Sequence, residues 1–222
     1  MYEDTVQILA SLFNESKNVA KLMYRILTVQ KDKISFKDIL SFAENITGSR
    51  STGKELTEET LLSMYWWRML LPVRMKHMRS LSWDSRLFLP SENEFFEIPL
   101  CIKYVFEGLC SKGFWDYNYS PYKYFNQIKE PYKELIPTII EGIVERVCFR
   151  YYVTATMIKE ECLGNNFPSA RIGVLISELK GGGFISPFVS SSLPKIFRLK
   201  EEPLYELNKA LFILKLHTPN TN

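Results

Sequence analysis

Apolar residues recur every three or four positions through most of the chain, which is the period of an amphipathic helix. The pattern predicts a helix over residues 1–15 and a second helix over Lys17–Val29, with Ser16 as its N-cap. Ser35 is the predicted N-cap of a third helix, which stops near Gly48. Each of these segments has one apolar face to bury, so the first part of the chain is predicted to be helical.

The middle of the chain is punctuated by proline and glycine. The polar residues after Gly48 predict a loop, and Thr57 begins the next helix. Pro72 must end or kink that helix, because proline has no amide hydrogen and clashes with the preceding turn. Pro99 then opens a helix that runs through Cys110 and is ended by Gly113.

The following residues, 114–133, are rich in Tyr, Asn and Pro and have no sustained period, so they are interpreted as a connector. A helix is predicted over Glu134–Arg150, and Thr154 caps a short helix after it. Ser169 caps a longer helix that the glycines 181–183 stop. The second part of the chain therefore repeats the helical order of the first.

Each half also contains a predicted β-hairpin, with strands at Ser80–Leu89 and Glu94–Ile98 in the first half and at Phe184–Val189 and Lys195–Lys200 in the second. Each half thus reads as helices, then a hairpin, then a proline and a further helix. A repeated order of elements is stronger evidence than any single motif. The predicted units are an N-terminal helix (1–16), a first domain (17–113), the connector (114–133) and a second domain (134–222).

Three helices followed by a hairpin is the layout of the winged helix-turn-helix superfamily, and the second half resembles it better than the first. The resemblance is carried by a cap, an apolar face and a glycine before the first wing strand: Ser169, Ile172, Leu175, Ile176, Leu179, Gly183, Phe184 and Ile185. It implies a mainly α protein with small β-hairpins (α+β), built as two tandem winged-helix domains plus the N-terminal helix. It implies a binding module before any one biological role.

The net charge of +3 is unevenly distributed along the chain. Two stretches, 68–86 and 169–200, each hold five basic residues against one acidic residue. A winged helix contacts DNA with its third helix and wing, so the resemblance makes these the DNA-binding candidates: Ser169, Arg171, Lys180, Lys195, Arg198, Lys200, Arg68, Arg74, Lys76, Arg79 and Arg86. Arg171 is the residue expected to approach a base edge. The alternative is that both stretches are solvated surface, and a wider first window loses its excess.

Other classes of function lack their signatures. No phosphate-binding glycine loop, catalytic serine motif or zinc-protease motif occurs, and the chain has only two histidines, so no enzyme activity and no cofactor are expected. The four cysteines include no C-x-x-C pair, so no metal site is expected and a reducing cytoplasm is favoured. No run is long and apolar enough for a membrane span. Composition hints at a prokaryotic or archaeal source.

Two partners are therefore considered. Double-stranded DNA is the first, which would make the protein a transcriptional regulator. The alternative is a protein-interaction subunit of a transcription, replication or chromosome-organisation complex, and an apolar patch on a third helix would favour it. A homodimer could also form through the terminal helices 3–13 and 203–216; the second has an apolar stripe of Leu204, Leu207, Leu211, Phe212 and Leu214. Adjacent Trp66 and Trp67 cannot both face one core.

Overall fold

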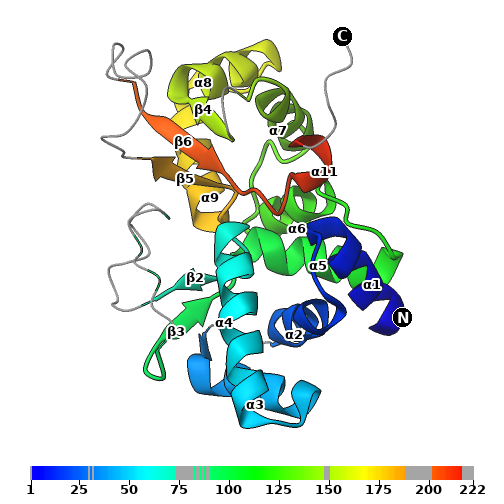
Figure 1. Ribbon diagram of the computed structural model, residues 1–222. Coiled ribbons are helices and arrows are strands. Elements are labelled where there is room, and N and C mark those ends of the chain that lie inside the picture. The colour runs from blue at the N-terminus through cyan, green and yellow to red at the C-terminus, as the bar shows by residue number, and fades with distance from the viewer. Residues whose placement is uncertain are drawn as a thin grey trace.

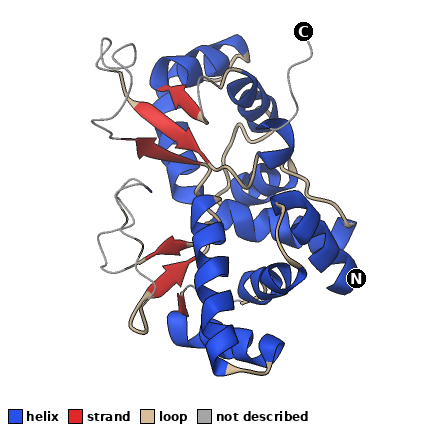
Figure 2. Ribbon diagram, viewed as in Figure 1, coloured by secondary structure: helices blue, strands red, loops and turns tan. Residues whose placement is uncertain are grey.

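A computed structural model describes residues 2–29, 31, 33–73, 83, 86, 88, 91–147, 151–188 and 202–216. It is mainly helical with two small antiparallel sheets, which is the expected α+β class (Figure 2). The second half of the chain lies above the first in Figure 1, and the strands of both sheets lie on the left-hand side of that view.

The first half contains α1 (Tyr2–Phe13), α2 (Lys17–Leu27), β1 (Ile34–Ser35), α3 (Phe36–Thr47), α4 (Arg50–Trp66), β2 (Leu71–Pro72) and β3 (Phe95–Glu97). The remainder contains α5 (Leu100–Lys112), α6 (Tyr119–Gln127), α7 (Ile136–Glu145), β4 (Tyr152–Thr154), α8 (Ala155–Gly164), the 3-10 helix η3 (Ser169–Arg171), α9 (Ile172–Gly182), β5 (Ile185–Phe188), β6 (Leu204–Leu207) and α11 (Ile213–Leu216). The predicted caps Ser16, Ser35 and Thr154 are confirmed, because each side chain accepts a hydrogen bond from the amide three residues later.

Both halves have the same order of elements: a helix, a short strand, two helices and two further strands. The strand order is β1-β3-β2 in the first sheet and β4-β6-β5 in the second, so the last strand is the central one in each. All pairs are antiparallel, with Leu71 opposite Glu97 in the first sheet and Ile185 opposite Leu207 in the second. The two halves therefore repeat one order of elements, as the sequence predicted. That order differs from the prediction by an additional strand after the first helix of each half and by a strand in place of the helix after Pro203.

The strands that form the hairpins differ from the prediction. Among the described residues β3 pairs with β1 and, as its hairpin partner, with Leu71–Pro72, where the sequence predicted the end or kink of a helix. Pro72 is tolerated there because β2 is an edge strand. Most of the predicted strand Ser80–Leu89, and all of Lys195–Lys200, lie outside the described residues.

The predicted loop after Gly48 is wrong in length. Gly48 ends α3 in the left-handed conformation (φ 69°), and α4 begins two residues later at Arg50, not at Thr57. Gly53 therefore lies inside α4, where a Cβ would come within 3.0 Å of the Glu44 backbone nitrogen. Its missing side chain lets α3 and α4 pack closely, so a residue that reads as a loop signal has a packing role in a helix.

The predicted last helix over 203–216 is also wrong. Leu204–Leu207 is a strand, buried along its whole length between β4 and β5, and only Ile213–Leu216 is helical. The leucines of the expected dimer stripe lie inside the fold, apart from Leu214. A central strand buries both faces, so its apolar residues need not alternate, and such a run is easily mistaken for a helix face.

The connector contains a helix that its sequence did not reveal. α6 occupies 119–127, and Pro121 is in its first turn, where a missing amide hydrogen costs nothing. Phe125 is fully buried, and its ring lies 5.9 Å from that of Phe184 in the second half. The following helix, α7, is shorter than the predicted Glu134–Arg150.

One continuous set of buried side chains runs through both halves and includes α1. Trp67 and Trp115 both pack edge-on against Phe13 of α1, with ring centroids 5.5 Å apart in each case. Trp66, its neighbour, points to solvent and is 63% exposed. The two tryptophans therefore do face different environments, as neighbours on a helix must.

Candidate nucleic-acid interface

α9 is the third helix of the second half and was the best-matched part of the predicted DNA-binding surface. It buries Ile172, Leu175 and Leu179, as predicted. Ser169 is not its cap, because a 3-10 turn over Ser169–Arg171 comes first and the Ser169 hydroxyl makes no capping bond. The exposed positions of α9 are occupied by Gly173, Val174, Ser177, Lys180 and Gly181, so this surface is small and nearly neutral.

Arg171, expected to approach a base, is held by a carboxylate of its own chain. Its Nη2 lies 2.5 Å from Oε2 of Glu130, whose side chain is fully buried. Glu130 Oε1 accepts a hydrogen bond from the Tyr132 amide at 3.1 Å, which fixes the carboxylate in the turn between α6 and α7. Burial, and then the charge of Glu130, raise the pKa of nearby Glu178 above its usual value. The Arg171 charge is thus compensated inside the fold.

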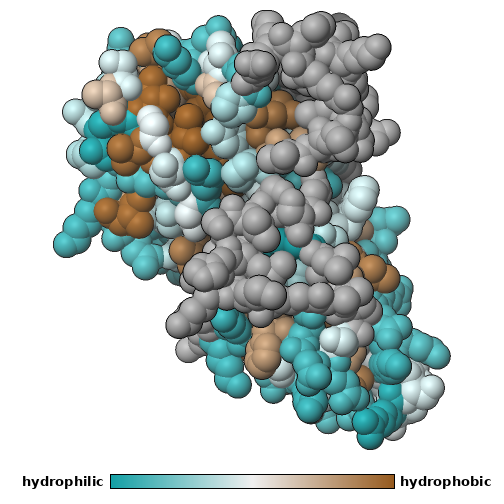
Figure 3. Space-filling model, turned by 90° about the vertical axis from the view of Figure 1, so that its left-hand side faces the viewer, coloured by the Kyte–Doolittle hydropathy of each residue, from teal (hydrophilic) through white to brown (hydrophobic). Residues whose placement is uncertain are grey.

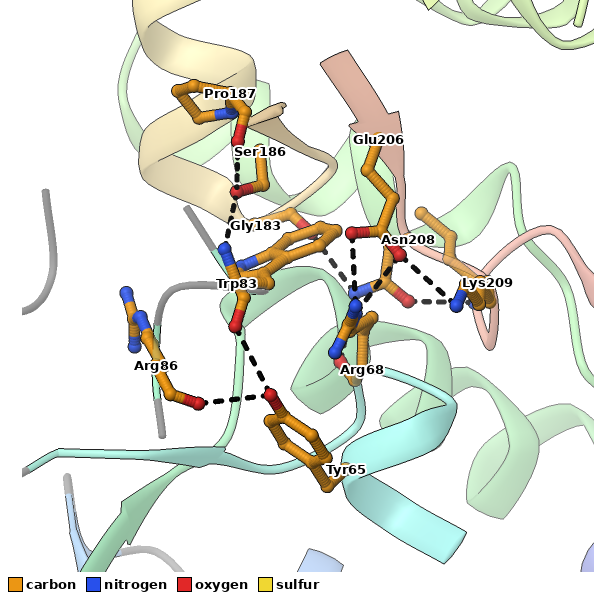
Figure 4. Close-up of polar contacts among 11 residues, drawn as sticks. Tyr65, Arg68, Trp83, Arg86, Gly183, Ser186, Pro187, Glu206, Asn208 and Lys209 are labelled. Atoms are coloured by element: carbon orange, nitrogen blue, oxygen red, sulfur yellow. Dashed lines mark hydrogen bonds and ion pairs between the residues drawn. The ribbon is translucent and has the colours of Figure 1, made fainter. Parts of the chain in front are cut away.

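Arg68 is likewise committed to an internal ion pair, which joins the two halves (Figure 4). Its Nε and Nη2 donate to the two oxygens of Glu206 at 3.1 and 3.2 Å, and both side chains are buried. Lys209 Nζ lies 3.2 Å from the same carboxylate. Asn208 Nδ2 donates to the carbonyl oxygens of Arg68 and Gly183. This bidentate geometry gives Arg68 a structural role at the junction.

Arg86 is buried beside the same junction. Its Nη1 donates to Glu97 Oε1 at 2.6 Å, and its carbonyl oxygen accepts the Tyr65 hydroxyl at 3.0 Å. The amide of Trp83 donates to Ser186 Oγ on β5 at 3.0 Å (Figure 4). Trp83 therefore attaches the first half to the sheet of the second, whereas the bonds of Arg86 stay within the first half.

The solvent face of α4, the third helix of the first half, is basic at its start, where Arg50 and Lys54 are exposed, and acidic and apolar from Glu55 onward. Its exposed positions include Glu55 and Glu59, and further along Leu62 and Trp66 are 55% and 63% exposed. The sequence window that began at Arg68 missed this face. A phosphate backbone would be repelled by these carboxylates.

Of the eleven predicted contact residues, six lie outside the described residues: Arg74, Lys76, Arg79, Lys195, Arg198 and Lys200. They belong to segments that join the strands of each hairpin, 74–82 between β2 and β3 and 189–201 between β5 and β6. The first segment has three basic and no acidic residues, and the second has three basic and one acidic.

These segments account for the positive charge of the protein. Residues outside the described ranges include seven basic and three acidic ones, so a total of +3 leaves the described residues at −1. On the side of the molecule seen in Figure 3, hydrophilic residues predominate over the lower, first half, and hydrophobic ones gather on the upper, second half.

Sequence reasoning missed Glu130, Glu206 and Asn208, which hold the two arginines and the junction. Glu130 lies in the residues interpreted as a connector, and the other two lie in the segment predicted as a terminal helix. The one available signal was that an arginine near an apolar run needs a carboxylate somewhere in the chain.

Metal and thiol chemistry have little support in the described part of the chain. There, no group of three or more His, Cys, Asp or Glu side chains could hold a metal ion. Cys101 and Cys162 are buried free thiols, and burial raises the pKa of Cys162 to about 11 and that of Cys101 still further. Both behave as small core residues. Over the same residues, the helices are too short or too polar to cross a membrane.

Comparison with known proteins gives one match. A family model covers residues 8–217, nearly the whole chain, and the function of that family is uncharacterised. No curated protein matches the chain, and no solved structure does.

Proposed function

The chain belongs to the family whose model matches residues 8–217, and we propose that it binds double-stranded DNA through the segments joining the hairpin strands. The observation that carries the proposal is the charge distribution. The described residues sum to −1, whereas 74–82 and 189–201 carry +3 and +2. Charge concentrated in two hairpin connections of an otherwise near-neutral protein suits contacts with phosphates.

The order of elements supports the same proposal. A helix, a strand, two helices and two strands in the order one-three-two resemble a winged helix-turn-helix domain, and this arrangement occurs twice. In that family the connection between the last two strands is the wing, which contacts the DNA backbone or the minor groove. We therefore assign the six basic residues of 74–82 and 189–201 as phosphate contacts and the protein as a cytoplasmic transcriptional regulator.

Under this proposal, contacts with base edges contribute little to DNA binding. The Arg171 guanidinium is paired with the Glu130 carboxylate, and carboxylates are exposed on α4. Two of the predicted contacts in and near α9 are exposed: Ser169, which precedes the helix, and Lys180 in its last turn. We expect DNA shape and phosphate geometry to determine preference more than base edges do.

Fluorescence anisotropy with a random duplex tests this function. We expect binding at about 50 mM salt that weakens steeply by about 200 mM. Lys195→Ala/Arg198→Ala/Lys200→Ala and Arg74→Ala/Lys76→Ala/Arg79→Ala should each weaken it roughly tenfold or more and flatten the salt dependence.

The matched control removes the same charge from α2, which packs on helices and, among the described residues, on neither sheet: Lys17→Ala/Lys21→Ala/Arg25→Ala. No binding by the wild-type protein at the lower salt, or an equal loss in the control, would reject the proposal.

A second function is favoured by the face of α4. Leu62 and Trp66 lie one turn apart, exposed beside Glu55 and Glu59, and Lys209 Nζ sits 4.4 Å from the Trp66 ring centroid. An exposed apolar pair of this kind on a third helix fits a protein subunit of a larger complex. Leu62→Ser/Trp66→Ser should then abolish copurification of a specific partner and leave DNA affinity unchanged. If the double variant copurifies with the same partner as the wild type, this second function is rejected.

A further inference from the structure

A cavity of about 370 Å³ opens between the two halves, where α5 begins and α9 ends. Its wall includes Arg86, Lys103 and Lys180, one carboxylate (Glu97), and the apolar side chains of Trp83 and Leu100. None of these residues belongs to the proposed phosphate contacts of the hairpin connections, although the sequence predicted DNA contacts at Lys180 and Arg86. Pockets of this size commonly hold small molecules.

The charge of the wall is positive. Arg86 and Glu97 neutralise each other across 2.6 Å, which leaves Lys103 and Lys180. Lys103 Nζ reaches the Lys31 carbonyl oxygen at 3.4 Å, and among the described residues neither lysine forms an ion pair. Two uncompensated ammonium groups facing one cavity favour an anion.

The backbone adds to this preference. Pro99 is the N-cap of α5, and no side chain caps the helix. The amides of Ile102 and Lys103 bond to the Pro99 carbonyl oxygen, so among the described residues the amide of Leu100, at the cavity wall, is the one left for a ligand. The N-terminus of a helix of this length carries about half a positive charge. Lys103 lies in the first turns of the same helix, so backbone and side chain attract the same kind of ligand.

A buried hydrogen-bond donor without a partner is independent evidence for a ligand. Arg86 is 3% exposed, and its Nε has no hydrogen-bond partner among the described residues. An unsatisfied buried donor costs about 1–3 kcal/mol. Arg86 is part of the cavity wall, so an anion bound in the cavity would supply the partner that its Nε lacks.

We propose that this cavity binds a small phosphate-bearing ligand with a planar apolar part, such as a nucleotide. Lys103, Lys180, the α5 N-terminus and Arg86 would hold the phosphate, and Trp83 and Leu100 would contact the apolar part. Arg86 is too deeply buried to reach the backbone of a duplex, so the site is distinct from the proposed DNA contacts. Trp83 also bonds to β5, which places the ligand between the two halves.

Isothermal titration calorimetry with ADP, pyrophosphate and inorganic phosphate tests the site. We expect ADP to bind more tightly than phosphate, and Lys103→Ala/Lys180→Ala to weaken ADP at least tenfold. Lys112→Ala is the control, because it removes a lysine from the opposite end of α5. No heat with any probe up to about 5 mM, or equal affinities in the double variant and the wild type, would overturn the proposal.

A further arm separates this ligand from DNA. Lys195→Ala/Arg198→Ala/Lys200→Ala should leave ADP affinity unchanged, and ADP should bind whether or not the protein binds a duplex. If a duplex displaces ADP competitively and that triple variant loses ADP affinity in parallel, the cavity is part of a DNA-binding surface and the small-ligand proposal is wrong.

Discussion

At the residue scale, three arginines that the sequence predicted as DNA contacts have structural roles. Arg68, Arg86 and Arg171 each face a carboxylate: Glu206, Glu97 and Glu130. Counting charges in a window along the sequence cannot detect this, because Glu206 is 138 positions from Arg68 and Glu130 is 41 from Arg171. A guanidinium that leaves water needs a counter-charge, so burial and pairing occur together.

The pair of Arg171 and Glu130 gives a direct test of that role. Arg171→Ala should lower the free energy of unfolding by about 3 kcal/mol, because it leaves a buried carboxylate unpaired. Urea denaturation measures the change. Adding Glu130→Gln to this variant should recover most of the lost stability. If Arg171→Ala alone costs less than about 0.5 kcal/mol, Arg171 behaves as an exposed surface residue and the structural role is wrong.

Glu178 gives a prediction about pH. Its pKa in the folded state is raised by burial first and by Glu130 next. The resulting stabilisation is complete below the unfolded pKa and is lost as pH rises through the folded pKa. Glu178→Gln should therefore raise the melting temperature at pH 7, and the advantage should vanish below about pH 4. An equal advantage at both pH values would contradict the assignment.

At the element scale, most local signals were correct, although Ser169 is not a cap and α4 does not begin at Thr57, whereas elements fixed by distant residues were missed. The caps at Ser16, Ser35 and Thr154 and the terminal glycines of α3 and α5 were predicted because each acts within about four residues. The strand over Leu204–Leu207 depends instead on β4 and β5, about 20 to 50 positions away. An apolar run of that length fits a buried strand or a helix equally well.

Two glycines at helix ends test how an element boundary is fixed. Gly48 and Gly183 both have positive φ values, 69° and 76°, and a Cβ at Gly183 would also meet Pro99 Cβ at 2.6 Å. Gly48→Ala should cost about 1 kcal/mol. Gly183→Ala should cost about 1–3 kcal/mol more, because α9 must also shift against Pro99. Equal losses in thermal unfolding would show that Pro99 does not constrain this turn.

At the scale of the whole molecule, the residues after β6 join the two halves. The Ala210 amide donates to the Trp67 carbonyl oxygen at 3.0 Å, and Trp115 Nε1 donates to the Ala210 carbonyl oxygen at 3.0 Å. Together with Arg68 and Glu206, these bonds place the C-terminal segment of the second half against the end of α4. The buried side chains of both halves are continuous, so we expect them to unfold as one unit.

That expectation is tested by following circular dichroism and tryptophan fluorescence during urea unfolding. The two transitions should coincide in the wild type. Arg68→Ala should lower the midpoint by the equivalent of about 1.5–3 kcal/mol, because buried Glu206 loses its bidentate partner and keeps only Lys209. Arg146→Ala is the control: its pair with Glu160 is exposed and should contribute less than about 1 kcal/mol. Separate transitions in the wild type would mean that the halves unfold independently.

The sequence by itself determined the helical periods, most helix ends, the repeated order of elements and the concentration of basic residues near two hairpins. These are local properties or sums along the chain. Tertiary structure alone decided that 204–207 is a central strand, that α6 exists, and that three arginines face carboxylates. Each of those outcomes depends on burial against residues remote in sequence, and the free energy of burial exceeds the weak preference of a short segment for helix or loop.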